Sequence, residues 1–287
     1  MKLKKILVIF LIIVGGYLLF TSIMGNFPAL FGKEQTKAEI TNRIDTIEFD
    51  IASASLTIIP EKRDNLEAVL KGRGKLSVDQ KGDTVTVKHK KSWFEWVPFF
   101  NTAKLTVYVP EDYNKDMLLD VGSGNMSLSG KSAKQPYELD NLTVDMSSGN
   151  VNLENLQVDT FVHDASSGNL TVHSLVSNSS SIDISSGKVK MTDYAGELNA
   201  DLSSGRLVVQ MSELKDSIQI DVSSGSVELD LPDQADFTLD GETGSGNISC
   251  DFPLTIKKQD NHRIKGSHGS GKHEIEVGVS SGNVRIF

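Results

Sequence analysis

The chain has 287 residues and 38% hydrophobic content, enough for one sizeable folded body. Its single cysteine, Cys250, excludes a disulfide framework within the chain and argues against a cysteine-based zinc site. The formal net charge of −9 is uneven, because residues 1–118 carry 17 Lys and Arg against 14 Asp and Glu, while residues 119–287 carry 12 against 24. The acidic C-terminal part argues against nucleic-acid binding, since phosphate contacts need clustered basic residues.

The first 40 residues are predicted to be a membrane anchor and a linker. Residues 1–5, MKLKK, contain three lysines, and residues 6–24 form an apolar run without a charge. As a helix this run spans about 28 Å, close to the thickness of a bilayer core. The positive-inside rule places residues 1–5 in the cytoplasm and everything after the anchor outside the membrane. Residues 25–40 begin with Gly and Pro and become polar, as expected of a juxtamembrane linker.

A cleaved signal peptide is the competing interpretation of this N-terminus. Its apolar region is normally shorter and ends in a pair of small residues three and one positions before the cleavage site. The exit from the run, residues 22–26 (SIMGN), offers no good pair of this kind, and no cysteine follows that could carry a lipid. The sequence therefore favours an uncleaved single-pass anchor.

Residues 41–118 predict irregular β structure that caps the repeats described below. Alternating apolar and polar runs occur at residues 44–49, 84–87 and 105–109, and the last is ended by Pro110. An open stack of strands needs such a cap, because its end exposes unpaired strand edges.

An aromatic segment lies inside this region, at residues 88–100 (KHKKSWFEWVPFF). Two interpretations stay open: the segment folds over the end of the repeats as a plug, or it contacts the membrane or a partner, as mixtures of Trp, Phe and Lys do at membrane interfaces. The candidate contact residues are Trp93, Phe94, Trp96, Phe99 and Phe100.

A short motif of two strands around a Ser-Ser-Gly corner is repeated from residue 119 to the C-terminus. The corner glycines are Gly124, Gly149, Gly168, Gly187, Gly205, Gly225, Gly246 and Gly282. A period near 20 residues predicts an all-β parallel solenoid with coils of about 18–21 residues. Partial copies occur at residues 268–275 and at residues 50–58, where Ala54 stands in place of glycine. An antiparallel meander or sandwich is the rival fold, but two-residue hairpins prefer Asn-Gly or Asp-Gly.

Three sets of apolar residues share one parity on each side of the corner, three positions before the glycine and two and four positions after it. They are Val121, Met146, Ala165, Ile184, Leu202 and Val222; Met126, Val151, Leu170, Val189, Leu207 and Val227; and Leu128, Leu153, Val172, Met191, Val209 and Leu229. Side chains two apart on a strand face the same side, so these sets are predicted to point inward and to form apolar ladders between stacked coils.

The chain stops on a further copy, residues 280–287, with no obvious cap after it. This copy is therefore expected to form the last coil. Either its edge pairs with another molecule, or Phe287 and the irregular copy around His268 cover it.

The strongest polar pattern is a row of carboxylates four positions before the corner glycine, which Glu242 continues. Its members are Asp120, Asp145, Asp164, Asp183, Asp201 and Asp221. At a strand spacing of ~4.8 Å, neighbouring carboxylates repel by roughly 0.9 kcal/mol in water. Serine hydroxyls two positions before the glycine are possible donors, and a hard cation such as Ca²⁺ is the alternative compensation. We expect no metal or cofactor site, with Asp145 to Asp221 as weak metal candidates.

Catalysis is not expected from this pattern. Two carboxylates on neighbouring coils can in principle act as acid and base on a polysaccharide, but all the acids are equivalent members of a repeat. The histidines at positions 262, 268 and 273 match no standard metal motif. A row of outward asparagines, Asn125, Asn150, Asn169, Asn247 and Asn283, is the candidate contact strip for a polar polymer.

These features together resemble the LiaG-like, membrane-anchored proteins of Gram-positive bacteria, which carry the β-strand-repeat domain labelled "putative adhesin". The matching features are the anchor, the run ending Tyr-Val-Pro at residues 108–110, the corner LDVGSGNMSL from Leu119 and the SSG series. The resemblance covers roughly residues 40–287 and implies an extracytoplasmic protein of the envelope stress response, without assigned catalytic residues.

The sequence thus predicts a non-catalytic binding or scaffold protein at the cell envelope. The alternatives are an accessory partner of a membrane sensor, docking through residues 88–100, and a polysaccharide-acting enzyme.

Overall fold

The computed structural model describes residues 36–72, 74–90, 103–260 and 262–287, which form seventeen strands. The strands are β1 Lys37–Glu39, β2 Thr46–Ser53, β3 Ser55–Glu61, β4 Asn65–Lys71, β5 Lys75–Lys81, β6 Thr84–Lys90, β7 Lys104–Pro110, β8 Asp116–Ser129, β9 Tyr137–Ala165, β10 Asn169–Glu213, β11 Ile218–Asp230, β12 Phe237–Thr243, β13 Asn247–Cys250, β14 Thr255–Gln259, β15 Arg263–His268, β16 His273–Val279 and β17 Asn283–Ile286.

No described residue belongs to a helix that could cross a membrane. The predicted anchor, residues 6–24, lies outside the described residues, as do residues 1–5 and the linker up to residue 35.

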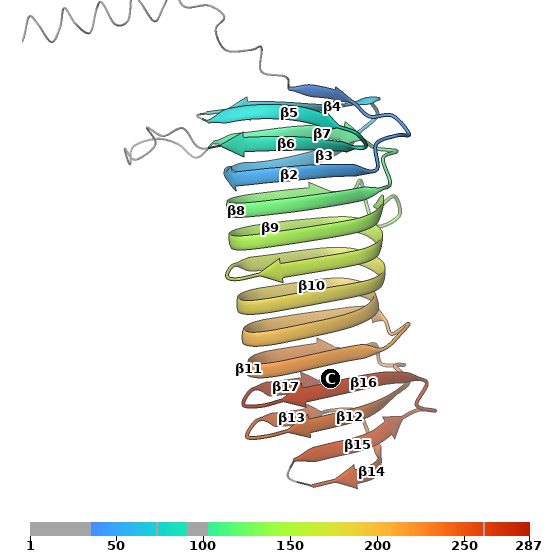
Figure 1. The fold of residues 1–287 in the computed structure, drawn as a ribbon. Helices are drawn as coiled ribbons and strands as arrows, with labels where there is room; N and C mark the ends of the chain where they lie inside the picture. The colour runs from blue at the N-terminus through green and yellow to red at the C-terminus, as the bar shows by residue number, and fades with distance from the viewer. Residues whose placement is uncertain (1–35, 73, 91–102, 261) are drawn as a thin grey trace, which may run out of the picture. The chain divides into compact units, whose positions relative to one another are not determined.

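The strands form the coils of a stack, and the all-β prediction is confirmed (Figure 1). Strand β8 pairs with β9 in parallel, β9 with β10, and β10 with β11. The register aligns equivalent repeat positions, so that Gly124 lies beside Gly149 and Gly205 beside Gly225. Parallel pairing of equivalent positions is what the near-constant period predicts of a β-solenoid.

The interior of the stack is built from the three predicted apolar sets. Every member is buried, with exposures from 0% at Leu128 to 7% at Ala165. Because each side chain lies over its counterpart on the next coil, the sets become continuous ladders. Burial of this kind contributes about 25 cal/mol for each Å² of apolar surface removed from water.

The corner glycines are required for two different reasons. Gly124, Gly149, Gly168 and Gly187 have φ between +128° and +139°, where a residue with a Cβ is strained. At Gly205 and Gly225 the φ angle is not in this region, but an added Cβ would lie 2.8 and 2.6 Å from the carbonyl oxygen of the preceding corner glycine. Close approach between coils therefore demands glycine even where the backbone angle does not.

The N-terminal end of the stack is closed by antiparallel strands. Strands β2 and β3 pair in parallel with β8 on one side and with β6 and β7 on the other. Strand β5 then pairs antiparallel with β6, β4 with β7, and β1 with β4. Both halves of the outermost coil are thus covered by strands of opposite direction, which cannot propagate the repeat.

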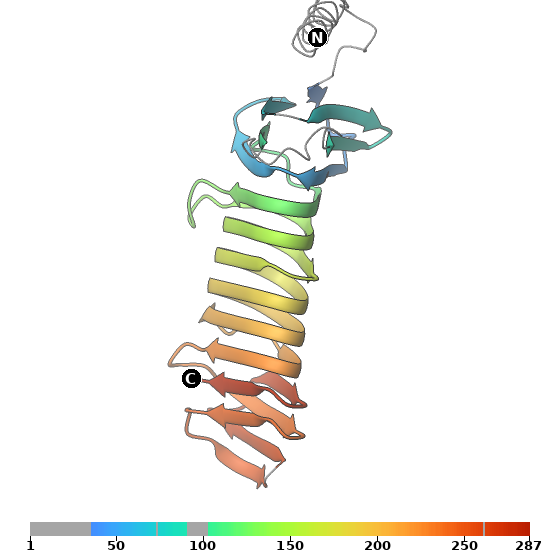
Figure 2. The same cartoon turned by 90° about the vertical axis from the view of Figure 1, so that its left-hand side faces the viewer.

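The C-terminal end corrects the expected order of coils. The last copy is not the last coil, because β16 pairs in parallel with both β11 and β12, and β17 with both β11 and β13. Figure 1 accordingly shows the C-terminus one coil inside the end of the stack. The cap is the hairpin of β14 and β15, whose strand β15 pairs antiparallel with β12 (Figure 2).

The partial copy expected at residues 268–275 is a turn rather than a corner. It joins β15 to β16, and Gly269 and Gly271 have φ of +67° and +77°. The Asp236 carboxylate holds this turn by accepting hydrogen bonds from Ser270 Oγ at 2.7 Å and from the Gly271 and Lys272 amides at 2.6 and 2.9 Å. These hydrogen bonds, that of Ser270 first, lower the pKa of Asp236.

Among the described residues, the apolar interior contains a polar cluster and two buried histidines, His89 and His163. The Ser177 hydroxyl lies 2.8 Å from that of Ser180 and 3.0 Å from that of Tyr194, which donates to the Glu197 carbonyl at 2.6 Å. His163, 1% exposed, donates from Nδ1 to the Val144 carbonyl at 3.1 Å. Burial lowers its pKa, so the ring is neutral at pH 7.

Replacing Gly187 with alanine is expected to lower the free energy of unfolding by roughly 2–3 kcal/mol. Its φ is +136°, and the added Cβ would lie 2.2 Å from the Gly168 carbonyl oxygen. Gly82→Ala is the matched control, because Gly82 has φ of +65° with no atom within 4 Å of the added Cβ. Strain alone predicts a loss of about 1 kcal/mol there. Urea unfolding of both variants measures the difference, and equal losses would contradict the importance of close approach.

Candidate functional site

The predicted carboxylates form an exposed row along the stack. Asp120 lies beside Asp145, Asp164 beside Asp183, and Asp201 beside Asp221 in the strand register. Burial is the main cause that raises the pKa of Asp145, and the neighbouring Asp164 and Asp120 carboxylates raise it further. Burial and then Asp221 and Asp183 raise the pKa of Asp201 in the same way. Neighbouring carboxylates therefore repel one another at these two positions of the row.

The compensation expected for this row is not provided by its serines. Among the described residues, the hydroxyls of Ser147, Ser166, Ser185, Ser203 and Ser223 donate no hydrogen bond to these carboxylates, although Ser147, Ser166 and Ser185 line a groove of about 350 Å³ beside them. Within the described ranges, no group of three or more His, Cys, Asp or Glu side chains is arranged to hold a metal ion.

The predicted asparagine strip is divided in two. Asn150 Nδ2 donates to Asn125 Oδ1 at 2.8 Å, and Asn169 Nδ2 donates to Asn150 Oδ1 at 2.9 Å. Asn283 pairs in register with Asn247 near the other end of the stack. The positions between them are occupied by Lys188, Arg206 and Ser226. The aromatic candidates Trp93, Phe94, Trp96, Phe99 and Phe100 lie outside the described residues.

The carboxylate row is broken at Gly278, and this break opens a wide cleft. Gly278 lies between Asp221 of β11 and Glu242 of β12 in the register, so Glu242 does continue the row but is one coil further away than expected. A Cβ at position 278 would lie 2.3 Å from Asp221 Oδ1, so the Asp221 carboxylate leans over the glycine. The cleft that results has a volume of about 740 Å³.

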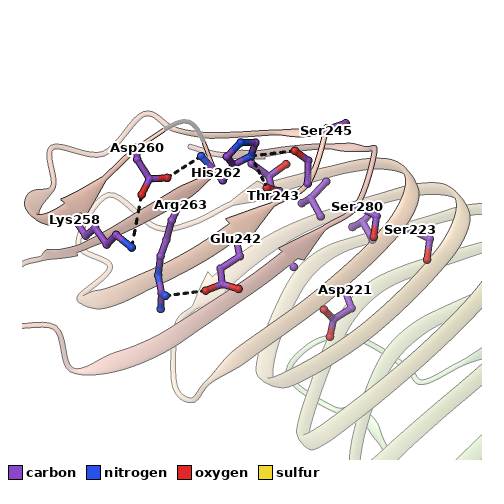
Figure 3. Close-up of a pocket in the computed structure, with 14 residues that line it drawn as sticks. Asp221, Ser223, Glu242, Thr243, Ser245, Lys258, Asp260, His262, Arg263 and Ser280 are labelled. Carbon is purple, nitrogen blue, oxygen red and sulfur yellow. Dashed lines mark hydrogen bonds and ion pairs between the residues drawn. The ribbon is translucent and has the colours of Figure 1, made fainter.

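Four segments that are distant in sequence form the walls of this cleft (Figure 3). Asp221 and Ser223 come from β11, Glu242 and Thr243 from the end of β12, and Gly278 and Ser280 from the end of β16 and the corner after it. The hairpin of β14 and β15 adds Lys258, Asp260, His262 and Arg263. The cleft therefore needs both the C-terminal coil, which lies between β11 and β12, and the cap hairpin.

Arg263 fixes the carboxylates on one wall. It lies opposite Glu242 in the antiparallel register, with Nη1 2.8 Å from Glu242 Oε1, and its Nη2 lies 3.1 Å from both oxygens of Asp240. Lys265, opposite Asp240, pairs with the same carboxylate. Lys265, followed by Arg263, lowers the pKa of Asp240. The cap thus holds both carboxylates in place, and it favours the ionised form of Asp240.

His262 is fixed by backbone contacts on another wall. Its Nδ1 lies 3.1 Å from the carbonyl oxygens of both Thr243 and Gly244, so Nδ1 must carry the hydrogen. In the neutral ring Nε2 is then an acceptor. The His262 amide donates to Asp260 Oδ1 at 2.8 Å, which lowers the pKa of Asp260, and Lys258 Nζ lies 3.6 Å from Asp260 Oδ2.

The residues around this cleft offer several kinds of hydrogen-bonding group. Figure 3 draws no hydrogen bond between His262 and Ser223 or Ser280, so these drawn residues contain no paired nucleophile and base. They do present hydroxyls, fixed carboxylates and an imidazole to one space. Sequence reasoning missed this cleft, although one local signal existed, since the copy EVGVSSG has Gly278 where the other copies have Asp or, at position 242, Glu.

Comparison with known proteins identifies a family for most of the chain. The profile of the family described as Toastrack DUF4097 matches residues 44–287. No curated protein matches the chain.

Solved bacterial structures share similarity with the chain at low identity. A "putative adhesin" from Bacteroides fragilis is 12% identical over 88% of this chain and 95% of its own, with a TM-score of 0.47. A "putative adhesin" from Parabacteroides distasonis is 12% identical over 87% and 95%, with a TM-score of 0.44. A "putative lipid binding protein" from the same species is 14% identical over 89% and 98%, with a TM-score of 0.47.

Replacing Asp145 with asparagine is expected to stabilise the protein at pH 7 by roughly 1 kcal/mol. Two neighbouring carboxylates at ~4.8 Å each cost roughly 0.9 kcal/mol in water, and salt screens part of this. The folded-state pKa of Asp145 is raised, so its ionisation favours the unfolded state. The gain should therefore disappear as the pH falls and Asp145 becomes protonated, and should shrink in 1 M NaCl.

Urea unfolding at pH 7 and at pH 3 measures this effect. Asp233→Asn, at an exposed turn position outside the row, is the control and should change stability little at either pH. A loss of stability in Asp145→Asn at pH 7 would contradict the repulsive row.

Proposed function

We propose that this chain, which belongs to the Toastrack DUF4097 family, is a non-catalytic binding or scaffold protein at the outer face of the cell membrane. One observation carries the proposal. Polar side chains recur at the same register on successive coils and form a long row of Asp and a shorter row of Asn over a buried apolar interior. Such a surface offers many equal contacts to a repetitive polar partner.

The same repetition argues against catalysis. A reaction needs a group that differs from its neighbours in position or protonation. Asp145 and Asp201 are shifted in the same direction for the same reasons, which is the behaviour of a row rather than of an acid and base pair.

The location is part of the proposal. Residues 6–24 anchor the chain as a single span, with residues 1–5 in the cytoplasm and residues 25–287 outside. The resemblance to LiaG-like proteins of Gram-positive bacteria supports a role in the envelope stress response. A cell-wall polymer is the partner that suits a polar, repetitive surface in that location.

A second candidate function is that of an accessory partner to a membrane sensor. The observation that favours it is the concentration of Trp and Phe at residues 93–100, the composition of a membrane-interface or docking segment.

Sedimentation with cell walls purified from a Gram-positive bacterium separates the two candidates. The full-length chain and a variant lacking residues 91–100 are both expected to sediment with the walls. Loss of sedimentation in the deletion variant, with unchanged unfolding behaviour, would favour docking through the aromatic segment. Failure of both chains to sediment would contradict the wall-binding role.

A further inference from the structure

We infer that the cleft at the break in the carboxylate row binds a neutral, polyhydroxylated saccharide. The inference rests on the proposed function and adds the place and the chemical class of the ligand. The cleft, at about 740 Å³, has the size of a small-molecule site and holds a short oligosaccharide.

The charge of the lining favours a neutral ligand. Asp221, Glu242 and Asp260 are set against Lys258 and Arg263, and most of these charges are already paired. Arg263 is shared between Asp240 and Glu242, and Lys258 lies by Asp260. A polyanion or a polycation would have to break these pairs, whereas a hydroxyl can join them as both donor and acceptor.

The hydrogen-bonding groups that remain are matched to hydroxyls. Asp221 Oδ2 accepts from Gln219 Nε2 at 3.3 Å, which leaves Oδ1 at the cleft. Ser223 and Ser280 are exposed, and their hydroxyls make no hydrogen bond with the other residues drawn in Figure 3, although the Ser280 backbone pairs with Val222 and Ser245. His262 adds Nε2, since its Nδ1 is used by two carbonyls. Hydrogen-bond acceptors and hydroxyls, which both donate and accept, thus face the same cleft.

The lining argues against an acyl chain. Its larger apolar residues are Val222 and Val279, each only 3% exposed because both point into the interior of the stack. Burial of apolar surface is what binds a lipid tail, and the side chains of these two valines offer almost none to the cleft.

Position 278 provides a sharp test. Gly278→Asn fills the space between Asp221 and Glu242 and must displace the Asp221 carboxylate, which is the flexible end of a side chain. The fold should tolerate it, because six other coils carry Asp at this register. Asp233→Asn is the control, since it introduces the same side chain at an exposed turn position outside the row and the cleft.

The experiment measures binding of the full-length chain, in a polyoxyethylene detergent that carries no sugar, to an array of neutral oligosaccharides of glucose, mannose, galactose and N-acetylglucosamine. We expect binding to at least one, weakened at least tenfold in Gly278→Asn and in Asp221→Asn and changed less than twofold in Asp233→Asn. No binding to any neutral oligosaccharide overturns the inference, and so does undiminished binding by Gly278→Asn.

Binding to anionic wall polymer or to peptide alone also overturns the ligand class. Cell-wall sedimentation distinguishes a failure of this inference from a failure of the proposed wall-binding function. Sedimentation with walls but no saccharide binding leaves the envelope role standing and removes the cleft. Saccharide binding without sedimentation supports the cleft and contradicts the wall-binding role.

Discussion

Parallel pairing in register is the constraint on which the rest of the structure depends. It places each residue over its equivalent on the next coil, so any preference of one repeat position is multiplied along the stack. Inward apolar positions are stabilised by this stacking, as where the buried side chains of Val151 and Leu170 lie in register on neighbouring coils. The corners can hold only glycine where backbones approach closely. At outward positions the same stacking brings like charges together, which costs free energy. Burial raises the pKa of Asp145, and the neighbouring carboxylates raise it further.

Antiparallel strands cover the outermost coils at both ends of the stack and stop the repeat. A basic residue also lies against the carboxylate row near each end, on the parallel strand β6 at the N-terminal end and on the antiparallel strand β15 at the C-terminal end. Lys88 of β6 lies opposite Asp50, with 3.8 Å between Nζ and Oδ2, and Arg263 of β15 lies opposite Glu242, with 2.8 Å between Nη1 and Oε1. At the C-terminal end the chain also returns inside the stack, and its Gly278 interrupts the row. The cleft is a consequence of how the stack is terminated.

The features set by local pattern were predictable from the sequence, and those set by chain order were not. Alternation around each corner predicts the three inward sets between Val121 and Leu229, and the equal register of the aspartates follows from the same alignment. Nothing local shows that residues 283–286 insert between β11 and β13, because that depends on a hairpin within the preceding gap. The cleft was missed for the same reason, since Asp221, His262 and Gly278 meet only through this inverted order.

Disulfide trapping tests the inverted order most directly. In a Cys250→Ser background, cysteines at positions 226 and 283, which are register partners, should form a disulfide on mild oxidation. Cysteines at positions 226 and 247 should not, because the coil of β16 and β17 separates them by about two strand spacings, ~9.6 Å. The reverse result, a bond between positions 226 and 247 and none between 226 and 283, would show that the coils stack in sequence order and would contradict the account.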